Sequence, residues 1–296
     1  MTAPALAHDT PLGRMYSRSL SERPSVPSIT TVIGVEGMDL GGWHGYMAAQ
    51  ALAKDSRLPQ AVGNPSGLRQ LVRDASGASE KYRDSAAARG DRVHYYCEQV
   101  SLEALGREHE KAAALDALAS NGEVGYAHAF DRWWQDFGVK PLEPELTVWN
   151  SDFGYAGTLD LIAEIGGKLC IVDYKTKGSD RDGRVKPLDP KVALQLVAGL
   201  RAEERLDDAQ SGSWSEFPFG KAPMLIGVAL GENEVQASAV NSEVWRTAWQ
   251  KFWSLRQVWA ANYELAGKTA PLTPLPPPPA SARQGSAAPA AERSAP

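Results

Sequence analysis

The stretch YAGTLDLIAEI-GG-KLCIVDYK, residues 155–175, decides the fold of this protein. Two runs rich in aliphatic and β-branched residues flank Gly166 and Gly167. A Gly-Gly pair between such runs predicts a two-residue β-hairpin, because the favoured turns need positive φ at the loop positions. With the two glycines as the loop, the facing pairs are Ile165 with Lys168, Ala163 with Cys170, Leu161 with Val172, and Asp160 with Asp173.

This hairpin would bring two carboxylates, Asp160 and Asp173, onto one face, with their Cβ atoms about 4.5–5.5 Å apart. Two carboxylates at that distance repel unless a cation lies between them, and oxygen ligands without cysteine suit Mg²⁺ or Mn²⁺. Lys175 lies on the same face as Asp173, since side chains alternate along a strand. Its ammonium could orient a water or stabilise charge on a phosphoryl group. The alternative is an ordinary hairpin with a Lys175–aspartate salt bridge, and a one-residue slip in register would turn Asp160 to the other face.

Working outward from the hairpin, periodicity and turn residues predict a mixed order of helices and strands. We expect strands at 145–150, 155–165, 168–175, 223–230 and 234–240, and helices at 41–54, 85–105, 123–137, 189–205 and 242–263. Residues 25–35 read as a β-branched segment followed by a glycine-rich turn, and 59–66 as a loop. This order predicts an α/β (α+β) fold, a central mixed β-sheet flanked by helices after a mainly helical N-terminal part.

The domain organisation follows from changes in composition. Residues 1–24 are polar and interrupted by prolines, so we expect a flexible N-terminus. Residues 25–265 would form a single domain, with a helical part at 25–140 and the sheet core at 141–265. The Pro/Ala-rich residues 266–296 contain too little apolar surface to fold, and we expect them to be disordered.

Composition excludes several classes of protein. A net charge of −5 shows that the chain is not a general polycation, so binding to nucleic acid would need a local basic groove. The two cysteines, Cys97 and Cys170, form no CxxC pair, which argues against a structural zinc site, and they are too few for a four-cysteine iron–sulfur cluster. Two free thiols suit a reducing cytoplasm. We find no signal peptide, and the longest apolar run, near 224–230, is too short to span a membrane. Gly267-Lys268-Thr269 lacks the glycine and strand of a Walker A motif, so we expect no bound nucleotide.

The strings Gly157-Thr158-Leu159-Asp160 and Asp173-Tyr174-Lys175-Thr176 resemble the motifs of the PD-(D/E)xK nuclease superfamily, most closely its RecB-like branch of phage and CRISPR-associated exonucleases. The resemblance spans about 89–195 and implies a restriction-endonuclease-like core. It assigns catalysis to Lys175, Asp160, Asp173 and Gln195, metal ligation to His94, Asp160, Asp173 and the Tyr174 carbonyl, and an accessory role to Glu145. By themselves, His94 could be a structural helix residue and Glu145 a solvated strand-end carboxylate. Relatives often carry an aromatic residue four positions after the glutamine, where this chain has Gly199.

The function that the resemblance implies is a Mg²⁺- or Mn²⁺-dependent DNA nuclease, with an exonuclease acting from DNA ends favoured. Such an enzyme would serve phage-type recombination, replication or repair, in the host cytoplasm if phage-encoded. Basic side chains that could follow the DNA backbone are Arg89, Arg92, Lys177, Arg181, Arg184 and Lys186, although the mixed-charge loop at 176–186 also reads as a solvated turn. The alternatives are a structure-specific or restriction-like endonuclease and a catalytically idle, DNA-binding recombination accessory protein. A recombinase or single-strand-binding partner and a homo-oligomer stay open.

Overall fold

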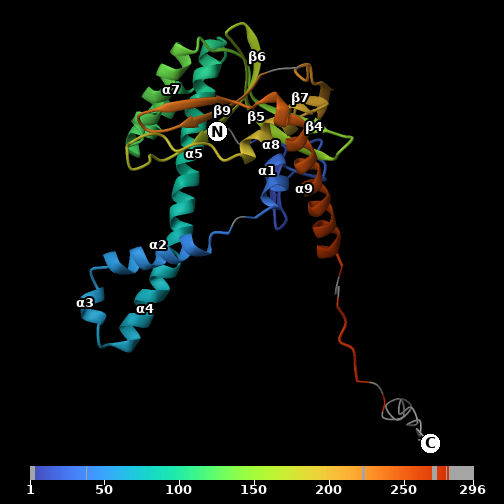
Figure 1. Cartoon of the computed structure of the whole chain (residues 1–296). Helices are drawn as coiled ribbons and strands as arrows, with labels where there is room; N and C mark the ends of the chain where they lie inside the picture. Colours follow the sequence, from blue (N-terminus) through green and yellow to red (C-terminus); the bar gives the residue numbers. More distant parts are fainter. Residues whose placement is uncertain (1–3, 38, 222–223, 269–271, 278, 280–296) are drawn as a thin grey trace, which may run out of the picture. The chain divides into compact units, whose positions relative to one another are not determined.

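The computed structural model describes residues 4–37, 39–221, 224–268, 272–277 and 279 (Figure 1). The chain divides into two units, 1–259 and 260–296, and the first contains every strand of the described residues. In the described part of the second unit, the last helix continues to Ala266.

A seven-stranded mixed sheet forms the centre of the first unit, in the order β10-β9-β6-β5-β4-β7-β8. Strands β6 and β9 are parallel, and the other neighbours in the sheet are antiparallel. The strands are β4 (Lys140–Asn150), β5 (Tyr155–Ile165), β6 (Lys168–Thr176), β7 (Glu204–Asp208), β8 (Ser213–Glu216), β9 (Met224–Leu230) and β10 (Val235–Ala239). Because β5 and β6 are buried on both faces, they read as nearly continuous apolar runs in the sequence.

The hairpin between β5 and β6 has the predicted register. Gly166 and Gly167 both have positive φ (58° and 74°), and the ladder pairs Ile165 with Lys168 and Leu161 with Val172. The ladder ends at that last pair, one position short of the predicted facing pair of Asp160 and Asp173. The two central strands therefore separate where the carboxylates lie.

Helices cover both faces of the sheet. One core contains side chains of α1, α8 and α9, and the other contains side chains of α5, α6 and α7. The helices are α1 (Ile29–Gly34), α2 (Gly41–Lys54), α3 (Leu58–Ala61), α4 (Pro65–Ser76), α5 (Ala78–Ala104), α6 (Lys111–Ser120), α7 (Val124–Asp136), α8 (Lys191–Leu200) and α9 (Trp245–Ala266), with a 3₁₀ turn, η1 (Ser242–Val244). This arrangement confirms the predicted α+β class with its central mixed sheet. No helix in the described part of the chain is both long and apolar enough to cross a membrane.

The N-terminal residues differ from the prediction. Instead of a flexible segment at 1–24, the described residues include a small three-stranded sheet, β1 (Ala7–Thr10), β2 (Gly13–Tyr16) and β3 (Val26–Pro27). Leu6 and Tyr16 are buried against Trp149 and Ala156 of the central sheet. The prediction of a flexible segment is therefore wrong for residues 4–24, because residues far along the chain complete a core that the segment cannot form alone.

Smaller differences have a similar cause. The predicted helix at 189–205 ends at Leu200, and Glu204–Asp208 forms β7, because Arg205 and Glu204 pair with β4 and override local helix propensity. Strand β8 was not expected. Residues 25–35 form β3 and α1 instead of a strand followed by a turn, and the predicted loop at 59–66 contains α3 and the start of α4. Much of the predicted tail, at 269–271, 278 and 280–296, lies outside the described residues.

Candidate metal centre

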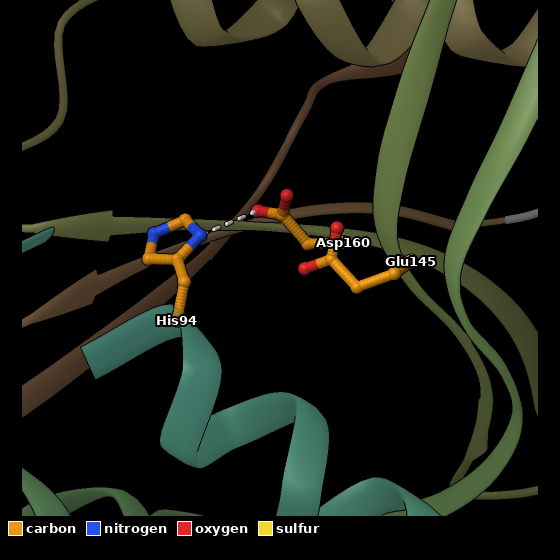
Figure 2. Close-up of side chains that lie close together, drawn as sticks. All are labelled: His94, Glu145 and Asp160. Carbon is orange, nitrogen blue, oxygen red and sulfur yellow. Dashed lines mark ion pairs between the residues drawn. The ribbon is translucent and has the colours of Figure 1, made fainter. Parts of the chain in front are cut away.

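Three side chains from three elements meet at the point where β5 and β6 separate. His94 comes from α5, Glu145 from β4 and Asp160 from β5 (Figure 2). One ligand atom of each lies within 4.8 Å of the others, and this is the only such group of three or more His, Cys, Asp or Glu residues in the described parts of the chain. The structure thus brings together two predicted ligands and the residue expected to be accessory.

The position of Asp160 follows from its side chain, which takes the place of one backbone–backbone hydrogen bond between β5 and β6. Its Oδ2 accepts a hydrogen bond from the Tyr174 backbone N–H at 2.6 Å. Leu159 packs in the core with α8, but Leu161, two positions later, packs in the opposite core with α5 and α7. Residues two apart on a regular strand share a face, so β5 must rotate at Asp160. This rotation places the carboxylate between the strands.

Glu145 of β4 lies next to the rotation of β5 at Asp160. The β4–β5 ladder pairs Pro144 with Leu161 and Leu146 with Leu159, and it skips Glu145 and Asp160. Glu145 has a φ of 47° and is the only non-glycine residue with positive φ in the described chain. This conformation costs about 1–3 kcal/mol and tends to occur at functional sites. The strain turns the carboxylate toward Asp160 and His94 (Figure 2).

The protonation states follow from burial and crowding of charge. Burial, with the charges of Asp160 and Glu98 nearby, raises the pKa of Glu145 to about 9. Burial also raises the pKa of Asp160, which the Lys175 charge and the Tyr174 N–H partly offset. For His94, burial and the Lys175 charge lower the pKa to about 4, so the ring is neutral at pH 7. A neutral imidazole is the form that binds a metal.

The group fits a divalent cation. His94 Nδ1 and Glu145 Oε2 are buried and have no hydrogen-bond partner among the described residues, and Nδ1 lies 3.8 Å from Asp160 Oδ2. Unpaired buried polar atoms are costly, and a cation would satisfy both. One imidazole nitrogen with carboxylate oxygens, and no cysteine, is a donor set that suits Mn²⁺ or Mg²⁺.

Asp173 stands beside this group as the partner of Lys175, on the same side of β6 as the sequence predicts. The ammonium Nζ of Lys175 lies 2.7 Å from the Asp173 carboxylate and donates more weakly to the Tyr174 carbonyl at 3.3 Å. Burial raises the pKa of Asp173 to about 6, although the Lys175 charge opposes the shift. Burial alone would lower the pKa of Lys175, but the charges of Asp173 and Asp160 outweigh it and raise that pKa. The predicted ligands Asp173 and Tyr174 O are therefore engaged by the lysine in this structure.

A cavity of about 130 Å³ opens onto the site. His94, Asp160, Lys175 and Gln195 line it, so the structure brings the predicted helix glutamine to the same cavity as Lys175, the lysine predicted to be catalytic. The remaining lining residues are Gly157, Thr158 and a set from the N-terminal segment: Pro4, Arg14, Tyr16, Ser28, Ile29 and Thr30. Gly157 is required there, because a Cβ would lie 2.7 Å from Ile29 Cδ1.

The N-terminal wall of the cavity is the part of the site that the sequence analysis missed. The Tyr16 hydroxyl lies 3.0 Å from Thr158 Oγ1, two residues before Asp160. Thr10 and Gly13 pair across a turn formed by Pro11 and Leu12, and Gly13 has a φ of 97°. Proline at the second position and glycine at the fourth are typical turn residues, so Thr10-Pro11-Leu12-Gly13 is the signal that could have revealed this hairpin.

The basic residues predicted to contact DNA lie elsewhere. Arg92 makes a bidentate pair with Glu123 (2.7 and 2.8 Å), and the guanidinium of Arg89 lies over the Tyr126 ring. Arg184 is exposed in a loop whose backbone is held by Asp180, and Lys177 is partly buried. None of the six basic residues predicted to follow the DNA backbone lines the 130 Å³ cavity.

Gly199, the position at which members of the resembled superfamily often carry an aromatic residue, packs closely against β5. A Cβ at this position of α8 would lie 2.5 Å from Leu159 Cδ2. Leu159 occupies this space because β5 rotates at Asp160, so a larger side chain at Gly199 would require Leu159 to shift.

Comparison with known proteins adds little to this geometry. Neither a protein-family model nor a curated protein matches the chain. Fifteen chains of solved structures match. One of them, described as "Crystal structure of SSO0001", is 18% identical, with 62% of this chain and 82% of that chain covered, and its TM-score is 0.23.

Proposed function

We propose that this protein is a metal-dependent DNA nuclease that hydrolyses phosphodiester bonds, acting as an exonuclease at DNA ends. One observation carries the proposal. A compact donor group of His94, Glu145 and Asp160 lies beside an ion-paired Lys175, and both border one cavity. A lysine ammonium next to an acidic cation site is an arrangement suited to phosphodiester hydrolysis, because it places positive charge where the phosphoryl oxygens gain negative charge.

The donor group would hold Mg²⁺ or Mn²⁺ through His94, Glu145 and Asp160. When bound, the ion would supply Lewis acidity and lower the pKa of a water. The Tyr174 N–H orients the Asp160 carboxylate by its 2.6 Å hydrogen bond. Asp173 keeps the Lys175 amine charged and holds it toward the cavity, where it can donate a hydrogen bond to a phosphoryl oxygen.

The walls of the cavity favour action at a strand end. The N-terminal segment, through residues that include Arg14 and Tyr16, forms part of the cavity wall beside His94 and Asp160 and restricts access to the site. A free end can enter such a space more readily than an internal position of paired DNA. Gln195 lines the same cavity and can donate to a non-bridging phosphate oxygen through its amide.

Degradation of end-labelled linear DNA in Mg²⁺ or Mn²⁺ tests the proposal. We expect wild type to release short products and Lys175→Ala to lose at least about 100-fold in kcat, as when one donor to a developing charge is removed. Lys168→Ala is the matched control, because Lys168 begins the same strand and is exposed away from the cavity.

Two results would contradict parts of the proposal. Equal activity of wild type and Lys175→Ala would show that the nuclease site is assigned wrongly. Cleavage of closed circular DNA as fast as linear DNA would replace the exonuclease by an endonuclease.

A further inference from the structure

Arg14, in strand β2 of the N-terminal hairpin, lines the cavity of the metal centre. Only Arg14 and Lys175 among the described lining residues carry a full positive charge, and Lys175 is already paired with Asp173. Asp160 contributes a carboxylate to the same lining, and carboxylate charge repels a phosphate. A second cation at this entrance, besides a bound metal, would therefore favour an anionic substrate.

The guanidinium of Arg14 is largely available for a ligand. Among the described residues its side chain makes one hydrogen bond, from Nε to Asp9 Oδ1 at 3.2 Å. Both partners are exposed, Arg14 by 46% and Asp9 by 82%, and exposed pairs of this kind contribute about 0–1 kcal/mol. The two terminal nitrogens can therefore form the bidentate contact with phosphate for which arginine is suited.

The backbone of Arg14 is fixed in position. Its carbonyl oxygen accepts hydrogen bonds from the Ser28 N–H and the Thr31 hydroxyl, both at 2.9 Å. Two residues later, Tyr16 is joined to Thr158 of β5. The Arg14 charge also lies close enough to the Tyr16 hydroxyl to oppose the rise in its pKa that burial causes. The hairpin thus carries the guanidinium on a rigid support next to the metal centre.

We propose that Arg14 binds a backbone phosphate of the substrate strand, next to the phosphate that is hydrolysed. The N-terminal hairpin is then part of the substrate-binding site. This inference rests on the proposed nuclease function for its choice of ligand. A phosphate contact positions the strand and carries no base information, so the contact would be independent of sequence.

The experiment measures binding of a fluorescein-labelled 12-nucleotide single strand by anisotropy, with Ca²⁺ replacing Mg²⁺ to prevent cleavage, over a range of salt concentrations. For Arg14→Ala we expect about a tenfold higher Kd and a salt dependence lower by roughly one phosphate contact. Arg14→Lys should have the salt dependence of wild type but only part of its affinity. The lysine keeps the positive charge and lacks the two guanidinium nitrogens that contact phosphate together. In Mg²⁺, Arg14→Ala should raise KM more than it lowers kcat.

Asp9→Ala is the matched control, because it removes the same ion pair from the same hairpin and leaves the guanidinium in place. It should bind DNA as wild type does. Loss of affinity in Asp9→Ala equal to that in Arg14→Ala, or an unchanged Kd and salt dependence in Arg14→Ala, would overturn the inference. Thermal unfolding of each variant separates these results from misfolding, and Arg14→Lys supplies the same test if Arg14→Ala does not fold.

Failure of the inference and failure of the proposed function are distinguishable. If wild type cleaves DNA and Arg14→Ala matches it in KM and Kd, the inference alone fails. If wild type binds DNA through Arg14 but cleaves none with any divalent ion, the nuclease proposal fails and the contact stands. Absence of both binding and cleavage in wild type overturns both.

Discussion

At the scale of single residues, the candidate metal centre is a set of buried groups whose pKa values differ from those in water. Burial lowers the pKa of His94 and keeps the ring neutral, and burial, together with the nearby charges of Asp160 and Glu98, raises the pKa of Glu145 far above its ordinary value. Glu145 also has strained backbone. A protein that bound nothing here would gain stability by losing these features, so they are consistent with a site selected for a ligand.

Replacement of Glu145 tests this view through pH. Between its ordinary pKa of 4.5 and its folded pKa of about 9, the unfolded chain releases the Glu145 proton while the folded, metal-free protein retains it. The free energy of unfolding must therefore fall as pH rises through this window. In EDTA, we expect Glu145→Gln to be more stable than wild type by about 1–3 kcal/mol at pH 8 and nearly equal to it at pH 5.

Urea unfolding at the two pH values measures this difference. A stability difference that is the same at pH 5 and pH 8 would show that Glu145 is not the group that titrates. Asp173, whose pKa burial raises to about 6, is present in both proteins, so its titration does not by itself produce a stability difference between them.

At the scale of elements, the packing of α8 on β5 determines where Gln195 meets Asp160 and Lys175. Gly199 allows this close approach, because a Cβ would collide with Leu159. We expect Gly199→Ala to lower the free energy of unfolding by about 1–3 kcal/mol, as overpacking does in other cores. Gly90→Ala, within helix α5 where a Cβ meets nothing within 4 Å, should instead raise it by up to about 1 kcal/mol.

Chemical denaturation of the two alanine variants measures both changes in the free energy of unfolding, the decrease in Gly199→Ala and the increase in Gly90→Ala. Equal effects would mean that helix propensity alone acts at both sites and that α8 has room to move away from β5. A loss of cleavage in Gly199→Ala beyond its loss of stability would indicate that the position of Gln195 depends on this contact.

At the scale of the whole molecule, a metal that binds only the folded protein must stabilise it. At a free concentration 100 times its Kd, the ion adds about 2.7 kcal/mol, which corresponds to a rise in Tm of roughly 5 °C or more for a chain of this size. We expect Mn²⁺ to raise the Tm of wild type relative to EDTA and to leave the Tm of Asp160→Asn unchanged. Asp152→Asn, an exposed carboxylate in the β4–β5 turn, should respond as wild type does.

Differential scanning calorimetry with and without Mn²⁺ gives these values. A rise in Tm of the same size in Asp160→Asn would place the stabilising ion elsewhere in the molecule. No rise in any variant would exclude the His94, Glu145 and Asp160 group as a metal centre under those conditions.

Local sequence determined the central part of this protein. Gly166 and Gly167 set the hairpin register, since their positive φ suits only a tight turn, and alternation along β6 placed Lys175 on the side of Asp173. Helix 41–54 also has its predicted bounds. These features depend on neighbours within a few residues, and short-range rules of turn and strand geometry describe such neighbours well.

Only the tertiary structure decided which groups share the candidate site. The register predicted that Asp160 faces Asp173, yet Asp160 pairs with the Tyr174 backbone and joins His94 and Glu145, while Asp173 holds Lys175. The N-terminal hairpin that brings Arg14 to the cavity looked flexible by composition. The hairpin reaches the cavity through contacts with residues more than 100 positions away in the chain. The carboxylates find their partners because β5 rotates and separates from β6. Such contacts depend on packing across the whole fold, which no local pattern specifies.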